Sequence, residues 1–64
     1  MAFFLHIAGG RFELAADEGA SSEIQRRLTD AARLDQRFRL VSGGTVIVHS
    51  SSAAPWVLEE VPAA

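Results

Sequence analysis

Residues 4–14 read FLHIAGGRFEL and residues 38–48 read FRLVSGGTVIV, so a Gly-Gly pair stands at the same point in two similar apolar stretches. Glycine pairs of this kind close tight hairpin turns, because glycine readily adopts the positive φ angles that such turns require. A phosphate-binding loop would instead lead from its glycines into the N-terminus of a helix. Each pair here leads into another strand-like run, so the two stretches predict β-hairpins rather than a nucleotide-binding loop.

In the first hairpin, one register sorts the side chains into two faces. If Gly9 and Gly10 form a two-residue turn, one face carries the apolar pairs Ile7 with Phe12, Leu5 with Leu14 and Phe3 with Ala16. The other face carries Ala8 with Arg11, His6 with Glu13 and Phe4 with Ala15. We therefore expect an apolar inner face and a mostly polar outer face.

A helix is predicted from about Ser22 to Gln36. Ser22 and Gln25 have the spacing of a capping box, which marks a helix N-terminus. At helical spacing a thin apolar stripe forms from Ile24, Leu28, Ala31 and Asp35, flanked by Ala32 and Leu34. The opposite side of this helix is expected to carry Arg26, Asp30, Arg33 and Arg37.

For the second hairpin we expect a three-residue loop, Ser42-Gly43-Gly44, with Gly44 in the left-handed position of a bulge. This loop gathers Phe38, Leu40, Val46 and Val48 on one face, and Arg39, Val41, Thr45 and Ile47 on the other. Residues 49–55, HSSSAAP, predict a loop, and the stretch PWVLEEV predicts a short last strand, with Pro55 at its start or on a sheet edge.

Together these elements predict an α+β fold. A small ββαββ(β) sheet of four or five strands with one helix packed across one face buries the apolar side of every element. Sixty-four residues form a single domain, residues 1–64, in which we expect residues 62–64 to be a frayed tail.

The opening segment, AFFLHIAGGRFELAADEGASSEIQRRL at residues 2–28, resembles the hairpin-then-helix start of β-grasp, ubiquitin-like domains in its order and spacing. The likeness covers about half of the chain and includes no diagnostic motif. Conjugating and sulfur-carrying members of that superfamily end in Gly-Gly, whereas this chain ends in VPAA. The resemblance therefore implies a fold and neither of those roles.

Composition excludes several classes of protein. With 48% hydrophobic and 22% charged residues the chain is too apolar to be a disordered tail, and without cysteine it has neither disulfides nor thiolate metal sites. Its start lacks the features of a signal peptide, and no apolar run reaches the roughly 18 residues of a membrane span, so we expect a cytoplasmic protein. All six basic residues are arginine, a usage typical of GC-rich genomes, which indicates a bacterial or phage origin.

The histidines offer the clearest candidates for chemistry. His6 opposite Glu13 has the geometry of an acid–base pair or part of a metal site, and His49 precedes the possible nucleophiles Ser50, Ser51 and Ser52. For His6 and Glu13, an exposed cross-strand polar pair is the favoured interpretation. A Ser-His couple at His49 is disfavoured, because consecutive strand residues point to opposite faces. Glu59 and Glu60 are also consecutive, so they would point to opposite faces of a strand and are interpreted as edge-strand charges. We therefore predict a protein that is not an enzyme and has no catalytic, metal or cofactor site.

Arginines on the far side of the predicted helix suggest nucleic-acid binding as an alternative function. Arg26, Arg33 and Arg37 would form a stripe able to contact phosphates. Asp30 and Asp35 interrupt it, lysine is absent and the net charge is −2, so a solvated, ion-paired helix face is the favoured interpretation.

The sheet face opposite the helix keeps apolar side chains, which favours a docking surface. The predicted registers leave there Phe4, Val41 and Ile47, with either Trp56 and Leu58 or Val57 and Val61. Contiguous apolar patches on small proteins mark interaction sites, and Trp56 is the natural anchor of this one. We therefore predict a protein-interaction module that forms a homodimer or binds a larger bacterial or phage protein, through the open sheet face or an edge strand. The alternative is that the C-terminal segment covers this face within the monomer.

Overall fold

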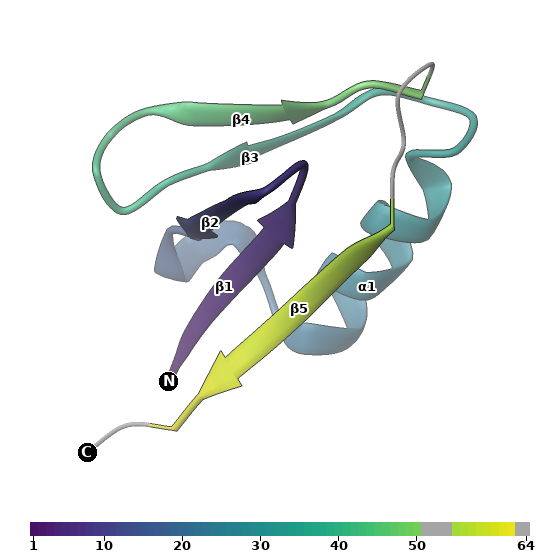
Figure 1. Cartoon of the computed structure of the whole chain (residues 1–64). Helices are drawn as coiled ribbons and strands as arrows, with labels where there is room; N and C mark the ends of the chain where they lie inside the picture. Colours follow the sequence, from purple (N-terminus) through teal and green to yellow (C-terminus); the bar gives the residue numbers. More distant parts are fainter. Residues whose placement is uncertain (51–54, 63–64) are drawn as a thin grey trace.

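Five strands and one helix follow each other along the chain in the computed structural model, which describes residues 1–50 and 55–62 (Figure 1). In chain order they are β1 (Ala2–Ile7), β2 (Gly10–Glu13), the short 3-10 helix η1 (Ala16–Glu18), α1 (Ser21–Asp30), β3 (Gln36–Arg39), β4 (Thr45–Val48) and β5 (Trp56–Val61). The strands form two antiparallel sheets, one with the order β2-β1-β5 and one with the order β3-β4. The predicted α+β class is confirmed.

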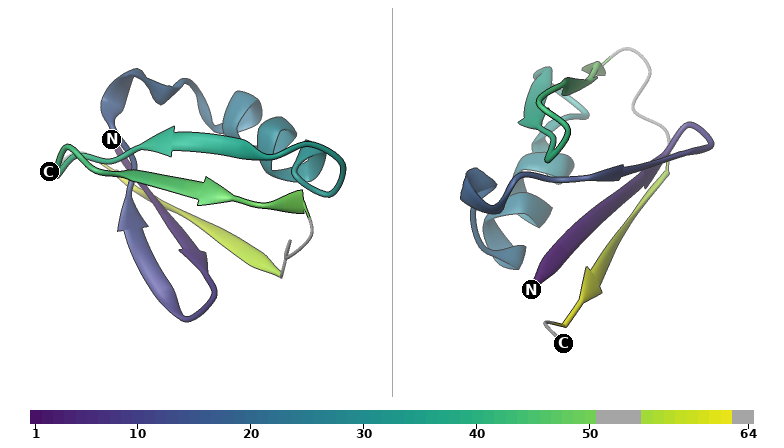
Figure 2. Two further views of the ribbon diagram at one scale, coloured as in Figure 1. Left: turned by 90° about the horizontal axis from the view of Figure 1, so that it is seen from above. Right: turned by 90° about the vertical axis from the view of Figure 1, so that its left-hand side faces the viewer.

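Helix α1 and the β3–β4 hairpin lie on the same side of the three-stranded sheet, as the two views in Figure 2 show. The core fills the space between these three parts, because each of them has one apolar side to bury. Its buried residues are Leu5, Leu14, Ile24, Leu28, Ala31, Phe38 and Val48.

The two sheets meet where β2 ends. Leu14 and Leu40 form an isolated antiparallel bridge. Beside it, the Ala15 N–H donates to the Arg39 carbonyl at 2.8 Å, and the Val41 N–H donates to the Glu13 carbonyl at 3.0 Å. Beyond this bridge the two hairpins diverge, as the left view of Figure 2 shows.

The turn of the first hairpin lies one residue earlier than the sequence predicts. Ala8 and Gly9 occupy it with φ angles of 51° and 80°, both in the left-handed region, so Leu5 pairs with Phe12. Gly10 belongs to β2, where an added Cβ would lie 2.7 Å from the Phe12 ring. The predicted pairs are therefore wrong, but they are displaced by an even number of residues, so the predicted separation into apolar and polar faces holds.

The turn of the second hairpin also lies one residue earlier than predicted. Its loop has the predicted length of three residues but consists of Val41, Ser42 and Gly43, with Gly43 at φ 95°. The Leu40 N–H donates to the Gly44 carbonyl at 2.8 Å, and Phe38 pairs with Val46. In both doublets the first glycine supplies the positive φ, and the second pairs across the turn.

Helix α1 ends at Asp30, six residues before the predicted end. Ile24, Leu28 and Ala31 are buried as predicted, whereas Leu34 is 67% exposed. The helix stops early because Gln36 begins β3, which places the Phe38 side chain in the core at 0% exposure. Its N-terminus also differs, since no side chain caps it and Gln25 Nε2 instead donates to Ser21 Oγ at 2.9 Å.

The last strand forms where it was predicted and pairs antiparallel with β1, with Leu58 opposite Leu5. All pairings are antiparallel and the strands divide into two sheets, so the β-grasp pattern suggested by residues 2–28 is not confirmed. Of the predicted loop 49–55 and tail 62–64, positions 51–54 and 63–64 lie outside the described residues.

Candidate functional site

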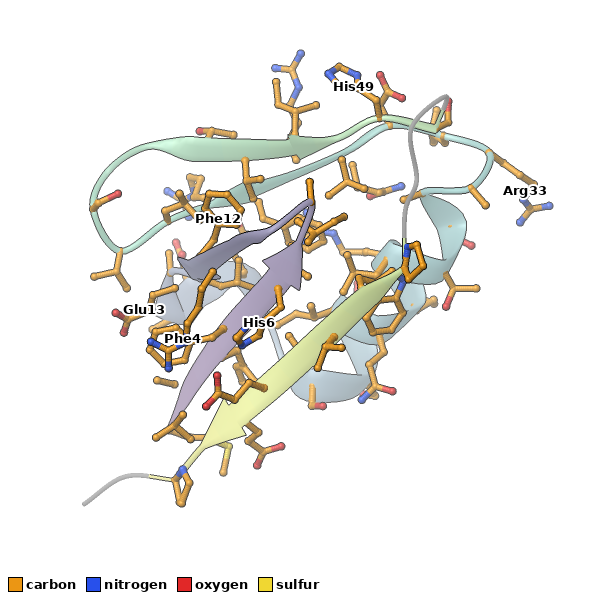
Figure 3. The ribbon with its side chains drawn as sticks, viewed as in Figure 1. Phe4, His6, Phe12, Glu13, Arg33 and His49 are labelled. Atoms are coloured by element: carbon orange, nitrogen blue, oxygen red, sulfur yellow. The ribbon has the colours of Figure 1, made fainter. Side chains whose placement is uncertain are left out.

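The outer face of the three-stranded sheet carries a polar network in place of the predicted His6–Glu13 pair. His6 Nε2 hydrogen-bonds with Glu59 Oε1 at 2.8 Å, and Arg11 Nε donates to the same oxygen at 3.2 Å. These bonds, His6 first and then Arg11, lower the pKa of the Glu59 carboxyl. The Arg11 guanidinium also lies 3.8 Å from the centre of the Phe4 ring. Glu13 faces Phe4 across the strands, and Figure 3 shows Phe4, His6 and Glu13 on this sheet.

Trp56 and Leu58 lie on the other side of the sheet. Both share the face of Leu5 and pack against the core. The prediction that they belong to the open face is therefore wrong, and the alternative pair, Val57 and Val61, occupies it. Val57 is 63% exposed beside the polar network, whereas Phe4 and Val61 on the same face are half-buried.

The three arginines of the nucleic-acid alternative do not form a row. Arg26 lies on α1, Arg33 in the turn after it and Arg37 on β3, because the helix ends at Asp30. Arg26 pairs with Glu23 at 2.7 Å and with Asp30 at 3.5 Å. Arg33 Nη2 lies 3.6 Å from the other oxygen of Asp30. Carboxylates thus neutralise two of the three charges, which leaves no continuous basic stripe on α1.

His49 is held at the end of β4 by an acidic side chain. Its Nδ1 lies 3.1 Å from Asp35 Oδ2, and Asp35 Oδ1 accepts the main-chain N–H of Ser50 at 2.7 Å. These bonds, the Ser50 amide first and then His49, lower the pKa of the Asp35 carboxyl. The suggested partners Ser51 and Ser52 lie outside the described residues. Within the described residues, no three histidine, cysteine or acidic side chains come together as metal ligands.

The two edges of the β3–β4 sheet differ in how their main chains are satisfied. On the β3 side, the Arg37 carbonyl accepts a hydrogen bond from the Arg27 guanidinium. The Arg39 N–H donates to Glu18 Oε2, and the Arg39 carbonyl accepts the Ala15 N–H at 2.8 Å. This edge is therefore covered by α1 and by the connection between β2 and α1.

Among the residues that the structure describes, nothing pairs with the β4 edge. The Leu40 N–H donates to the Gly44 carbonyl, and hydrogen-bonded pairs alternate with non-hydrogen-bonded pairs in an antiparallel ladder. The main-chain groups of Thr45 and Ile47 therefore point away from β3. Neither residue has a hydrogen-bond partner within residues 1–50 and 55–62. The strand, TVIV, also lacks the charges or proline that usually protect such an edge.

By contrast, the outer edge of β5 carries such protection. The same alternation directs the main-chain groups of Leu58 and Glu60 away from β1. Prolines at positions 55 and 62 flank this strand, and Glu59 and Glu60 place two charges on it. Proline and charge on an edge strand oppose pairing with another chain. Of these two open edges, β4 is the one suited to receive a further strand.

An apolar groove of about 180 Å³ lies between β4 and the tip of the first hairpin. Its lining residues are Ile7, Ala8, Gly10, Phe12, Val46, Ile47, Val48 and His49. Ile47 is 41% exposed at its rim, and Phe12, labelled in Figure 3, packs its ring over Gly10. The open edge and the apolar groove are adjacent, and together they form the candidate site, which we call the β4 groove.

Of the predicted docking residues, the β4 groove contains only Ile47. Val41 is 59% exposed in the β3–β4 loop, beside a second hollow that shares Phe12 with the groove, while Phe4 lies on the outer sheet face. Sequence reasoning assigned Phe12, Val46 and Ile7 wholly to the core. The alternation of apolar and polar residues predicts that these side chains face inward. It does not indicate that the second hairpin leaves part of this face uncovered.

Comparisons of the chain with protein-family models, with curated proteins and with solved structures found no match. The helix found in the described part of the chain is too short to span a bilayer.

Proposed function

We propose that this protein is a non-enzymatic protein-interaction module that binds another polypeptide at the β4 groove. The observation that carries the proposal is the adjacency of an apolar groove and an uncharged strand edge whose outward main-chain groups pair with none of the described residues. An extended segment added to such an edge gains main-chain hydrogen bonds, and its alternate side chains enter the neighbouring pocket.

Two features of the molecule support this function over the other candidates. The histidines are engaged with Glu59 and Asp35, and Arg26 and Arg33 with acidic neighbours. The edge of β4, in contrast, carries exposed donors and acceptors next to apolar side chains. Natural proteins usually protect such an edge against pairing, so an edge that stays open is best explained by a partner that pairs with it.

Site-specific photo-crosslinking tests the proposal. A photoreactive residue replaces Ile47 in one variant and Val57 in another. Both are exposed β-branched aliphatic residues, and they lie on strands of different sheets. We expect the variant at position 47 to crosslink to a partner protein and the variant at position 57 to crosslink to none. The purified partner, mixed with the purified chain, should again crosslink to position 47. Equal crosslinking from both positions, or crosslinking from position 57 alone, would contradict the assignment.

A further inference from the structure

The chemistry of the β4 groove points to one class of occupant. We propose that the groove takes an extended peptide segment of a partner protein in which apolar residues alternate with acidic ones. This inference rests on the proposed function and specifies the partner of that same site.

The small size of the site favours a peptide segment over a second copy of the chain. A stable interface between folded proteins buries roughly 800 Å² on each partner. That is about a fifth of the 4172 Å² that this chain exposes. The site itself consists of a four-residue strand edge and a groove of about 180 Å³. An extended segment uses a narrow edge efficiently, because it pairs its own main chain with the edge and inserts alternate side chains.

One face of such a segment must be apolar. A strand that pairs with β4 alternates its side chains between the two faces of the sheet. The inward set lies beside Val46 and Val48, above Ile7 and Phe12. Side chains of the valine, isoleucine and leucine class suit this lining, whereas a charged side chain would lose its hydration there without gaining a partner.

The other face favours acidic residues. On the solvent side of the β3–β4 sheet, Arg37 lies opposite Ile47 and Arg39 lies opposite Thr45. Arg39 already pairs with Asp17, whereas Arg37 makes no ion pair with any residue that the structure describes. A strand next to β4 runs roughly 10 Å from β3, two strand spacings away. A glutamate on that strand and Arg37 have long side chains that can meet above Ile47.

Synthetic peptides test this proposal directly. The probe is a fluorescein-labelled peptide with the sequence TEVEIEVT, and the charge-reversed control is TKVKIKVT. Binding to the folded chain is measured by fluorescence anisotropy at low salt. We expect the acidic peptide to bind about two- to fivefold more tightly than the basic one, the range of an exposed ion pair. Replacing Arg37 by alanine should remove most of this difference.

Main-chain pairing is tested from both sides of the contact. One peptide carries N-methyl groups on its three apolar residues and another carries them on its three glutamates, so each blocks one edge of the added strand. We expect one of the two to lose binding and the other to retain it. In the protein, Ile47→Pro removes the outward N–H without touching a β3–β4 bond, a change that edge strands tolerate. It should abolish binding, whereas Val57→Ala on the outer sheet face should leave it unchanged.

The possible results separate this inference from the proposed function. Equal binding of the acidic and basic peptides, or full binding by both N-methylated peptides, would overturn the inference. Absence of binding by every peptide would also overturn it, although a crosslinked partner at position 47 would then leave the proposed function standing. A dimer by light scattering that Ile47→Lys dissociates would make a second copy the occupant. If Ile47→Pro unfolds by circular dichroism, the N-methylated pair decides the question alone.

Discussion

Arg27 Nη1 lies 2.9 Å from Glu18 Oε1, and the same guanidinium lies 4.2 Å from the centre of the Phe38 ring. Both side chains of this ion pair are largely buried, at 22% and 11% exposure. The second oxygen of Glu18 accepts the Arg39 main-chain N–H. A single carboxylate thus ties the connection before α1 both to the helix and to the covered edge of β3.

The stability of the protein should therefore depend on the ionisation of Glu18. Burial raises the pKa of this carboxyl, but hydrogen bonds from the Arg39 amide and the Arg27 guanidinium, with both positive charges, outweigh it and hold the pKa below 4.5. A lowered pKa in the folded state gives stability that is present above pH 4.5 and is lost as the pH falls toward the folded value.

Glu18→Gln tests this dependence. The variant should lose about 1 to 3 kcal/mol at neutral pH, because a charged hydrogen-bond acceptor is removed. Between about pH 5 and about pH 3, the difference in unfolding free energy from the wild type should shrink. Urea denaturation at several pH values measures both quantities. Asp35 and Glu59 also have a lowered pKa, but they are present in both proteins and cancel in the comparison. A difference that is constant with pH would contradict the assignment.

Alternation along the strands could be predicted because it depends only on residues two positions apart. Phe38, Val46 and Val48 share a face in any register displaced by an even number, so the inner and outer faces were correct while both turns were displaced. Each glycine doublet is compatible with two turn positions that differ by one residue. Contact between Gly10 and the Phe12 ring distinguishes them in the first hairpin, and such a contact exists only in the folded chain.

The candidate site could not be predicted, because it depends on how the two hairpins cross. Sequence spacing extended the helix to Gln36, whereas the burial of Phe38 in β3 shortens it. The β3 edge is covered because Arg27 and Glu18 hydrogen-bond to its main chain, which leaves the β4 edge exposed. In the sequence, these two residues look like ordinary surface charges. Likewise, the pairing of β5 with β1 determines which of its alternate side chains face the core, and Trp56 is one of them.

The turn at Ala8 should limit the stability of the first hairpin. Ala8 is the only residue other than glycine with a positive φ, 51°, in the described part of the chain. Asparagine tolerates this conformation and would create the Asn-Gly pair that type I′ turns prefer. Ala8→Asn should therefore stabilise the protein by up to about 1 kcal/mol, because asparagine avoids part of the roughly 1 to 2 kcal/mol that the left-handed conformation costs. Thermal unfolding should show a rise of a few degrees, and Gly9→Ala at φ 80° should show a fall.

Two leucines should respond very differently to truncation. Leu5 is fully buried between the strands, while Leu34 is 67% exposed after the end of α1. Leu5→Ala should cost about 2 to 5 kcal/mol, because it removes apolar contact and leaves a cavity. Leu34→Ala should change stability by less than about 0.5 kcal/mol. Chemical denaturation of the pair checks the assignment of the core, and a comparable loss from Leu34→Ala would mean that the helix continues past Asp30.

The second glycine of each doublet provides a final matched test, this time of the β4 groove. A Cβ at position 10 would lie 2.7 Å from the Phe12 ring, whereas at position 44 the nearest atom, Ser42 Oγ, lies 3.7 Å away. Gly10→Ala should therefore displace the Phe12 ring, and Gly44→Ala should be accommodated within about 0.5 kcal/mol. We expect Gly10→Ala to change the aromatic NMR signals of Phe12 and to weaken peptide binding at the groove. Unchanged Phe12 signals in that variant would show that the ring does not pack over Gly10.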